Sequence, residues 1–152
     1  MLACDAGELD PSVLQLSAVR FVRGLVECSE FHALLQQHSA DIRLVVCDIN
    51  VFPKIAASLL REHVLKFMKH GILVLTFKMQ KNPSARSIAA AEAQVTSILR
   101  DIGGYDFKIV HLAANSKNER TLCCRIGITA GLSRTGPEGM CPNPESCPFE
   151  EL

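Results

Sequence analysis

Short apolar runs alternate with amphipathic segments along this chain, and no other feature restricts its fold as strongly. Six runs have the length and composition of β-strands: residues 1–4, 19–22, 43–47, 72–78, 107–112 and 121–126. Segments with a helical spacing of apolar residues lie between several of them. Strands that alternate with helices predict a largely parallel sheet with helices on both faces. We therefore expect an α/β fold.

Two segments show the helical period clearly. The apolar stripe after the third strand consists of Ile55, Leu59, Leu60, Val64, Phe67 and Met68. Gly71 follows it, at a position where helices favour glycine as they end. The stripe after the fourth strand consists of Ile88, Ala91, Val95, Ile98, Leu99 and Ile102, and Gly103 and Gly104 close it. Shorter helices are expected over residues 11–16 and 29–37.

The connection between the last two expected strands is different. Only the eight residues AANSKNER separate the run 107–112 from the run 121–126. A crossover between parallel strands needs about a dozen residues or more. We therefore expect these two strands to pair antiparallel.

Length and composition indicate one globular domain. The chain has 152 residues, of which 48% are hydrophobic and 21% charged, which is sufficient for a domain with its own core. No apolar run approaches the roughly 20 residues that span a bilayer, and residues 1–5 do not resemble a signal peptide. We expect a domain over residues 1–130. Residues 131–152 are rich in proline and acidic residues, and we expect a disordered tail there.

Cysteine usage favours a reducing compartment. The count of seven is odd, and no secretory signal accompanies it. A free thiol inside an apolar run behaves as a small buried hydrophobe, and four cysteines lie in such runs: Cys4, Cys47, Cys123 and Cys124. In the tail, Cys141 and Cys147 have no histidine nearby and do not supply four zinc ligands. We expect no bound metal.

A net charge of zero conceals a strong asymmetry. Residues 1–53 contain three basic and seven acidic residues, whereas residues 54–134 contain thirteen basic and five acidic ones, an excess of eight positive charges. Such a segment is compatible with a face that binds a polyanion such as RNA, although lysines on solvated helices give the same count. The candidates for RNA contact near strand ends are Lys54, Lys81, Arg86 and Lys117.

Polar residues end three of the expected strands. Asp5 ends the first, Asp48 follows the third and Lys78 ends the fourth. Ligands of open α/β sheets bind beyond the carboxyl ends of the strands, so these side chains could converge on one site. Simpler explanations exist for each, because an aspartate before a helix can cap it or form a turn and a terminal lysine can be solvated.

The order and spacing of several motifs resemble the FtsJ-type ribose 2′-O-methyltransferases. Within that family the chain is most similar to the RlmM branch, which acts on a cytidine of large-subunit ribosomal RNA. The stretches that carry the resemblance run from Cys4 to about Ile126 and read CDAGELDPSV, VRFVRG, CDINVFPKIAASL, LTFKMQ and SKNERTLCCRI. The resemblance implies a Rossmann-like sheet, mostly parallel with an antiparallel last strand, that binds S-adenosylmethionine.

The resemblance also implies roles for individual residues. Asp48, Lys78 and Glu119 match the aspartate, the second lysine and the glutamate of the family's Lys-Asp-Lys-Glu tetrad. Lys78 would orient a ribose 2′-hydroxyl and accept its proton, and Glu119 would fix the lysine in place. Asp48 would hold the lysine and help to place the methyl donor. Asp5 would accept hydrogen bonds from the donor's ribose.

One part of the family pattern is missing. The family's first strand, its glycine-rich cofactor loop and its first tetrad lysine precede the position of Asp5, where this sequence has four residues. The missing strand would lie between the strands that end in Asp5 and Asp48, so we expect two unpaired edges to face a gap. The family's aspartate near the adenine is also absent, and Glu27 lies nearest to its place. We expect the chain by itself to bind little cofactor.

Three functions remain open at this point. The first is an RNA 2′-O-methyltransferase, and the second is an inactive relative that binds RNA or a partner protein. The third is a nucleotide-dependent oxidoreductase, because the same sheet supports many chemistries; the spacing of Lys78 and Glu119 argues against it. The expected partner is ribosomal RNA and not a membrane. The expected compartment is the cytoplasm, or an organelle if a targeting segment precedes residue 1.

Overall fold

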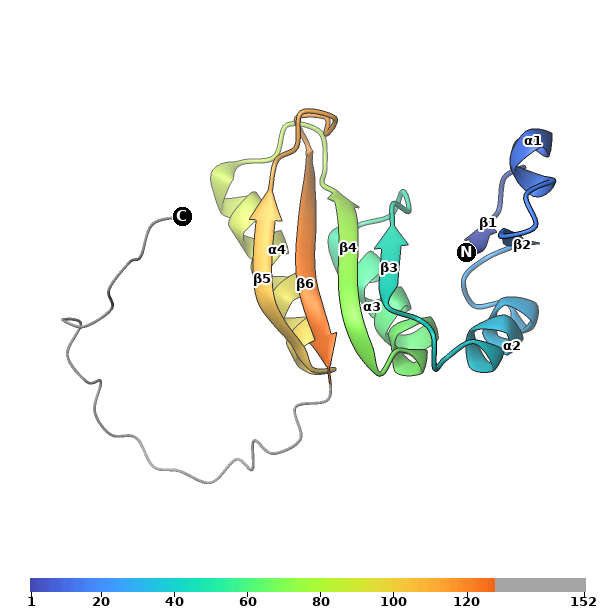
Figure 1. Cartoon of the computed structure of the whole chain (residues 1–152). Coiled ribbons are helices and arrows are strands. Elements are labelled where there is room, and N and C mark those ends of the chain that lie inside the picture. The colour runs from blue at the N-terminus through green and yellow to red at the C-terminus, as the bar shows by residue number, and fades with distance from the viewer. Residues whose placement is uncertain (128–152) are drawn as a thin grey trace, which may run out of the picture.

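The computed structural model describes residues 1–127 (Figure 1). Its strands are β1 (Leu2–Asp5), β2 (Arg20–Arg23), β3 (Leu44–Cys47), β4 (His70–Lys78), β5 (Gly104–Val110) and β6 (Glu119–Gly127). The connections contain the helices α1 (Pro11–Leu14), α2 (Ser29–Gln37), α3 (Pro53–His63) and α4 (Ala85–Arg100) and the 3₁₀ turn η1 (Leu65–Phe67). The expected tail at 131–152, with Cys141 and Cys147, lies outside the described residues.

The strands form two separate sheets. β1 and β2 pair in parallel, and a four-stranded sheet has the order β3-β4-β6-β5. In this sheet β3 is parallel to β4, whereas β6 is antiparallel to both β4 and β5. The fold is therefore α/β with parallel and antiparallel strands, and the predicted antiparallel pairing of the last two strands is confirmed. β1 and β3 do not pair with each other, in agreement with the expected gap between them.

Helices α3 and α4 lie behind the four-stranded sheet in Figure 1 and cover one of its faces. The strand residues of this covered face are buried: Leu73, Leu75, Phe77, Leu122 and Cys124. Alternate strand residues point to the opposite, open face, where Leu44, Val46 and Ile72 are 58%, 67% and 46% exposed. No helix within residues 1–127 covers the open face, so the prediction of helices on both faces is wrong for this part of the chain.

Helix α3 is shorter than its apolar stripe predicted. It ends at His63 because Val64 leaves helical geometry, with φ −124° and ψ −57°, and η1 then completes the connection to β4. The buried residues of α3 are Pro53, Ala56, Ala57 and Leu60. Ile55, predicted to be buried, is 48% exposed. Small alanine side chains let α3 lie directly against α4.

Gly71 has a different role from the predicted helix end. It is the second residue of β4, and a Cβ at this position would collide with the carbonyl oxygen of Arg43. That oxygen accepts a hydrogen bond of 2.8 Å from the Ile72 N–H. Glycine at position 71 therefore allows β3 and β4 to start their pairing.

Strand β5 begins and ends earlier than the predicted run 107–112. The ladder stops at Val110 because the next turn uses the Leu112 N–H, which donates to Asn115 Oδ1 at 2.7 Å. At the other end of β5, Asp106 has φ 54° and lies in an irregularity of the ladder between Tyr105 and Lys108. The apolar run in the sequence could not show either feature.

Two neighbouring residues of β4 test the assignment of the faces. Leu73 is fully buried on the covered face, so Leu73→Ala should lower the free energy of unfolding by about 2–5 kcal/mol through lost burial and a residual cavity. Ile72→Ala, on the open face, should cost about 1 kcal/mol or less. Urea denaturation followed by circular dichroism measures both values. Equal losses in the two variants would contradict the assignment.

Candidate active site

Three of the predicted site residues converge at the carboxyl edge of the four-stranded sheet. β3 delivers Asp48, β4 ends in Lys78 and β6 begins with Glu119. Asp48 Oδ1 lies 3.3 Å from Lys78 Nζ, and Glu119 is directly opposite Lys78 in the β4–β6 ladder. Side chains opposite each other in an antiparallel ladder are neighbours on one face. Lys78 therefore forms an ion pair with Asp48 on one side and has Glu119 on the neighbouring strand on the other.

The simpler explanation of Asp48 as a helix cap does not apply. The N-cap position of α3 is occupied by Phe52, and no side chain caps that helix. Asp48 instead directly follows β3, and its side chain is 64% exposed. It forms an ion pair with Lys78, whose side chain is 26% exposed. A pair this exposed contributes little to stability. The ion pair instead restricts the position of the Lys78 ammonium group.

Glu119 is held by the loop that precedes β6. The Ser116 N–H donates to Glu119 Oε2 at 2.9 Å, and the Glu119 N–H donates to the Ser116 carbonyl at 3.0 Å. The Ser116 N–H is the main cause that lowers the pKa of Glu119 below its ordinary value, and the hydroxyl of Ser116 and the charge of Lys78 lower it further. Glu119 is thus kept as a carboxylate beside Lys78.

A polar network behind the site was not predicted from the sequence. Thr76 and Thr121, opposite each other on the open face, bring their hydroxyls to 3.3 Å, and the Thr121 hydroxyl donates to Asn115 Oδ1 at 3.2 Å. The Asn118 side chain donates to the Met79 carbonyl at 3.1 Å. These bonds fix the loop between β5 and β6 on the end of β4. The sequence feature that could have indicated this network is the threonine in each of two otherwise apolar strands.

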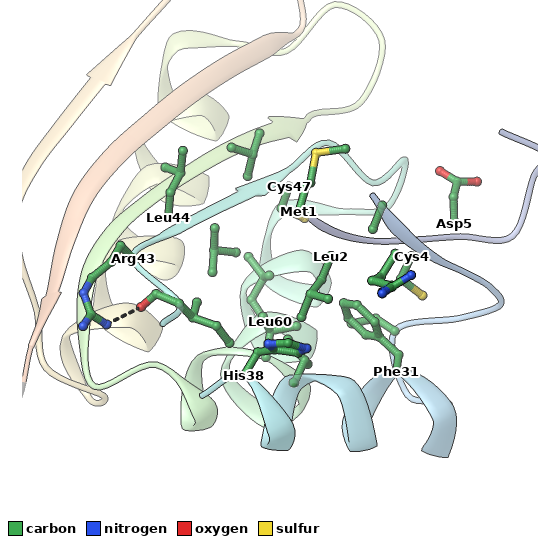
Figure 2. A pocket seen from close by; sticks show the side chains of 18 of the residues that line it. Met1, Leu2, Cys4, Asp5, Phe31, His38, Arg43, Leu44, Cys47 and Leu60 are labelled. Atoms are coloured by element: carbon green, nitrogen blue, oxygen red, sulfur yellow. Dashed lines mark hydrogen bonds between the residues drawn. The ribbon is translucent and has the colours of Figure 1, made fainter. Parts of the chain in front are cut away.

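Asp5 lies apart from this group, across a groove. It ends β1, is exposed, and accepts a hydrogen bond of 2.7 Å from the Gly7 N–H. The groove, which we call the strand gap, has a volume of about 1050 Å³ and lies between β1 and β3 above α2 and α3. Figure 2 shows Leu2 and Cys4 on one wall, Leu44 on the other, and Phe31 and Leu60 from the helices below. Asp5 and Asp48 both line the strand gap.

The thiols in the strand gap act as packing groups. Burial raises the pKa of Cys4 to about 11 and also raises that of Cys47. Both are therefore protonated at neutral pH, and a protonated thiol is a poor nucleophile. Within residues 1–127 the cysteines are free, and no group of three histidine, cysteine, aspartate or glutamate side chains could hold a metal ion.

The described residues fit S-adenosylmethionine only in part. Asp5 and Asp48 provide carboxylates at one end of the strand gap, and these suit hydroxyl or ammonium groups of a ligand. A ligand carboxylate needs N–H donors, which a glycine-rich turn at a helix N-terminus commonly supplies. Residues 1–127 have no such turn beside the strand gap; the helix that follows β3 starts with Pro53, which has no N–H. Glu27 is exposed in the connection after β2 and has no hydrogen-bond partner among the described side chains.

The four predicted RNA-contact residues belong to segments at the carboxyl edge of the sheet. Lys54 is in the first turn of α3, Lys81 follows β4, Arg86 is in the first turn of α4 and Lys117 is in the loop before β6. All four are exposed. The topology therefore places them around Asp48, Lys78 and Glu119, on the segments that a bound polyanion at that site would meet.

Comparison with protein-family models and with curated proteins finds no match for this chain. No helix within residues 1–127 combines the length and the apolar character that a membrane crossing needs. Interpretation of the site therefore depends on its geometry and on the resemblance in its motifs.

The pH dependence of stability tests the environment of Glu119. Because the folded-state pKa lies below the ordinary value of 4.5, the carboxylate stabilises the fold above that pH, and this contribution disappears as the pH falls through the folded value. Glu119→Gln should therefore be less stable than the wild type near about pH 6, with a difference that vanishes at low pH. Urea denaturation across this range measures it.

Glu92→Gln is the matched control. Glu92 lies on α4 and has no hydrogen bond or ion pair within residues 1–127. Its replacement should give a stability difference that does not change between these pH values. The same trend in both variants would show that the loop does not hold Glu119 in the manner described.

Proposed function

We propose that this chain supplies the catalytic residues of an FtsJ-type RNA ribose 2′-O-methyltransferase, built on a Rossmann-like sheet. One observation carries the proposal: Lys78 Nζ lies 3.3 Å from Asp48 Oδ1 and directly opposite Glu119, although the three residues come from separate strands. The same three residues match the family's tetrad in order and spacing. The Asp48 and Lys78 side chains form no other ion pair within residues 1–127, so no local structural need explains their pairing.

Lys78 is the residue that would contact the 2′-hydroxyl. Its side chain orients the oxygen of the hydroxyl, and Nζ, once it has released a proton to solvent, accepts the hydroxyl proton as the new O–C bond forms. The ion pair with Asp48 restrains the side chain, and Glu119 adds a second negative charge from the opposite strand, which together limit the positions of Nζ. Rigid placement matters here because an alcohol is a weak nucleophile and must be aligned with the methyl group.

S-adenosylmethionine, when bound, supplies the methyl group, and the C–S bond breaks as the O–C bond forms. Asp5 and Asp48 are the residues of this chain that would contact its polar groups. Donors for its carboxylate must come from residues other than 1–127, so we expect its affinity for this chain to be weak. Ribosomal RNA would lie across Lys54, Lys81, Arg86 and Lys117.

Methyl transfer tests the proposal directly. The full chain, in excess over unmodified ribosomal RNA and with labelled S-adenosylmethionine at high concentration, should place label on a ribose. Lys78→Ala should reduce the rate by about a hundredfold or more, because it removes both the orienting group and the proton acceptor. Lys69→Ala is the control and should leave the rate unchanged, because Lys69 directly precedes β4, at the end of that strand remote from Lys78. Full activity of Lys78→Ala would remove Lys78 from the mechanism.

RNA binding is tested separately by its salt dependence. If Lys81 and Lys117 contact phosphates, replacing either by alanine should weaken binding and reduce the slope of log K against log salt by about one. Lys69→Ala should change neither quantity. Fluorescence anisotropy with a structured ribosomal RNA fragment at several salt concentrations gives the slopes. An affinity that does not change with salt would contradict this contact surface.

The open strand gap favours a second function, that of an inactive relative that binds RNA or a partner protein. Such a protein would keep the basic segments and bind RNA without transferring a methyl group. Binding with the predicted salt slope but no label on the RNA, under the conditions above, would favour this second function over the first.

A further inference from the structure

Two cysteines from separate elements meet near the carboxyl end of β1. Cys4 is the third residue of β1, and Cys28 is the N-cap residue of α2. Both side chains are free thiols, both are partly buried, and both pack against the same apolar core. The fold therefore brings together two thiols that lie far apart in the sequence.

Both thiols lie against Gly24, in the connection after β2. The Cys4 thiol donates to the Gly24 carbonyl at 3.4 Å. A Cβ placed on Gly24 would lie 3.4 Å from Cys28 Sγ and 3.7 Å from Cys28 Cβ. Two backbone bonds hold this connection: the Gly24 N–H donates to the Asp5 carbonyl at 2.9 Å. The Cys28 N–H donates to the Leu25 carbonyl at 3.0 Å. The backbone thus fixes both thiols around one glycine.

The electrostatics of Cys4 show that the two side chains also interact directly. Burial is the main cause that raises the pKa of Cys4 to about 11, and the neighbouring Cys28 side chain raises it further through its charge and a hydrogen bond. Phe31 lies one helical turn after Cys28, and Figure 2 shows Cys4 and Phe31 close to each other in the strand gap. The side of α2 that begins at Cys28 therefore faces β1.

The other cysteines within residues 1–127 have no comparable partner. Cys123 and Cys124 are adjacent in β6, and successive strand residues point to opposite faces of a sheet. Cys47 is buried on β3, on the opposite wall of the strand gap from Cys4. In this part of the chain, Cys4 and Cys28 are therefore the two thiols placed to react with each other.

We propose that Cys4 and Cys28 are a redox modification site, which forms a reversible disulfide with a low-molecular-weight disulfide such as oxidised glutathione as the oxidant. In reducing compartments such bonds are usually transient and serve redox sensing or catalysis. The bond ties β1 to the start of α2 and closes a loop that contains α1 and β2. Asp5, the next residue, then belongs to a strand that is fixed to the floor of the strand gap.

The oxidation takes place in two exchange steps. Cys28 attacks first as a thiolate, because the Cys4 thiol is bonded to the Gly24 carbonyl and is protonated at neutral pH. A bond forms between Cys28 Sγ and one sulfur of oxidised glutathione, and the other sulfur leaves as a glutathione thiolate. Cys4 then loses its proton and attacks Cys28 Sγ, and the second glutathione thiolate leaves.

These steps balance. Two cysteine thiols are oxidised, one glutathione disulfide is reduced, and the two glutathione thiolates take up the two protons that the cysteines release. The mixed disulfide no longer carries the Cys28 charge, so one cause that raises the pKa of Cys4 disappears before the second step. Contact between the thiols favours that step, since an intramolecular attack has a high effective concentration.

Peptide mapping of the full chain tests the proposal, because trypsin separates the cysteines that matter. Cleavage after lysine and arginine leaves Cys4 in peptide 1–20, Cys28 in 24–43, Cys47 in 44–54 and both Cys141 and Cys147 in 135–152. The reduced chain is incubated with oxidised glutathione, its remaining thiols are alkylated, and it is digested without reductant. Mass spectrometry should show peptide 1–20 linked to 24–43 at least about tenfold more often than to 44–54. Dithiothreitol should remove the link.

Two variants and one condition serve as controls. Cys28→Ser should abolish the link and leave Cys4 as an alkylated thiol, whereas Cys47→Ser should keep the link. In concentrated urea the preference for 24–43 over 44–54 should disappear, because it depends on the folded contact. The mapping of the wild-type chain decides the question even if a variant does not fold.

Three results would overturn the proposal. The first is recovery of Cys4 and Cys28 as alkylated thiols, or of Cys28 as a lasting mixed disulfide with glutathione. The second is equal linkage of peptide 1–20 to 24–43 and to 44–54. The third is the same preference in urea as in the folded chain. None of these measurements depends on methyl transfer, so the outcome is independent of the function proposed above.

Discussion

The burial of β4 is the interaction on which the rest of the structure depends. Its residues Leu73, Leu75 and Phe77 are fully buried against the helices, and its two neighbours, β3 and β6, are aligned by its backbone. Apolar burial of this extent is the main stabilising term in a domain of this size. Because β4 is fixed so firmly, the polar residue at its end, Lys78, has a defined position.

The candidate active site uses that rigidity. Asp48 pairs with Lys78, and Glu119 lies opposite it, only because β3 and β6 are held in register with β4 on either side. The loop before β6 adds its own constraint, since Ser116 and Asn115 bind Glu119 and Thr121 through short hydrogen bonds. Functional groups supported by a sheet in this way need little further ordering before they act.

The strand gap and the exposed part of the open face meet at β3. β1 and β2 are separated from the four-stranded sheet, and Leu44 and Val46 of the edge strand β3 are exposed on its open face. An exposed edge next to exposed apolar side chains is a surface that proteins usually pair or cover. Asp48 lies where this surface meets the other residues of the candidate site, Lys78 and Glu119.

The sequence by itself determined the elements. Continuous apolar runs and the helical stripes predicted every strand and the two long helices, and the short link before Glu119 required an antiparallel pair, because local periodicity and chain length are encoded locally. Only the tertiary structure decided which side of each element is buried. Ile55 is about half exposed and no helix within residues 1–127 covers the open face, although neighbouring apolar residues look alike in the sequence. The Asp48–Lys78–Glu119 arrangement likewise depends on strand register between segments as far apart in the sequence as positions 48 and 119. Register is set by packing and ladder hydrogen bonds that act only once the chain has folded.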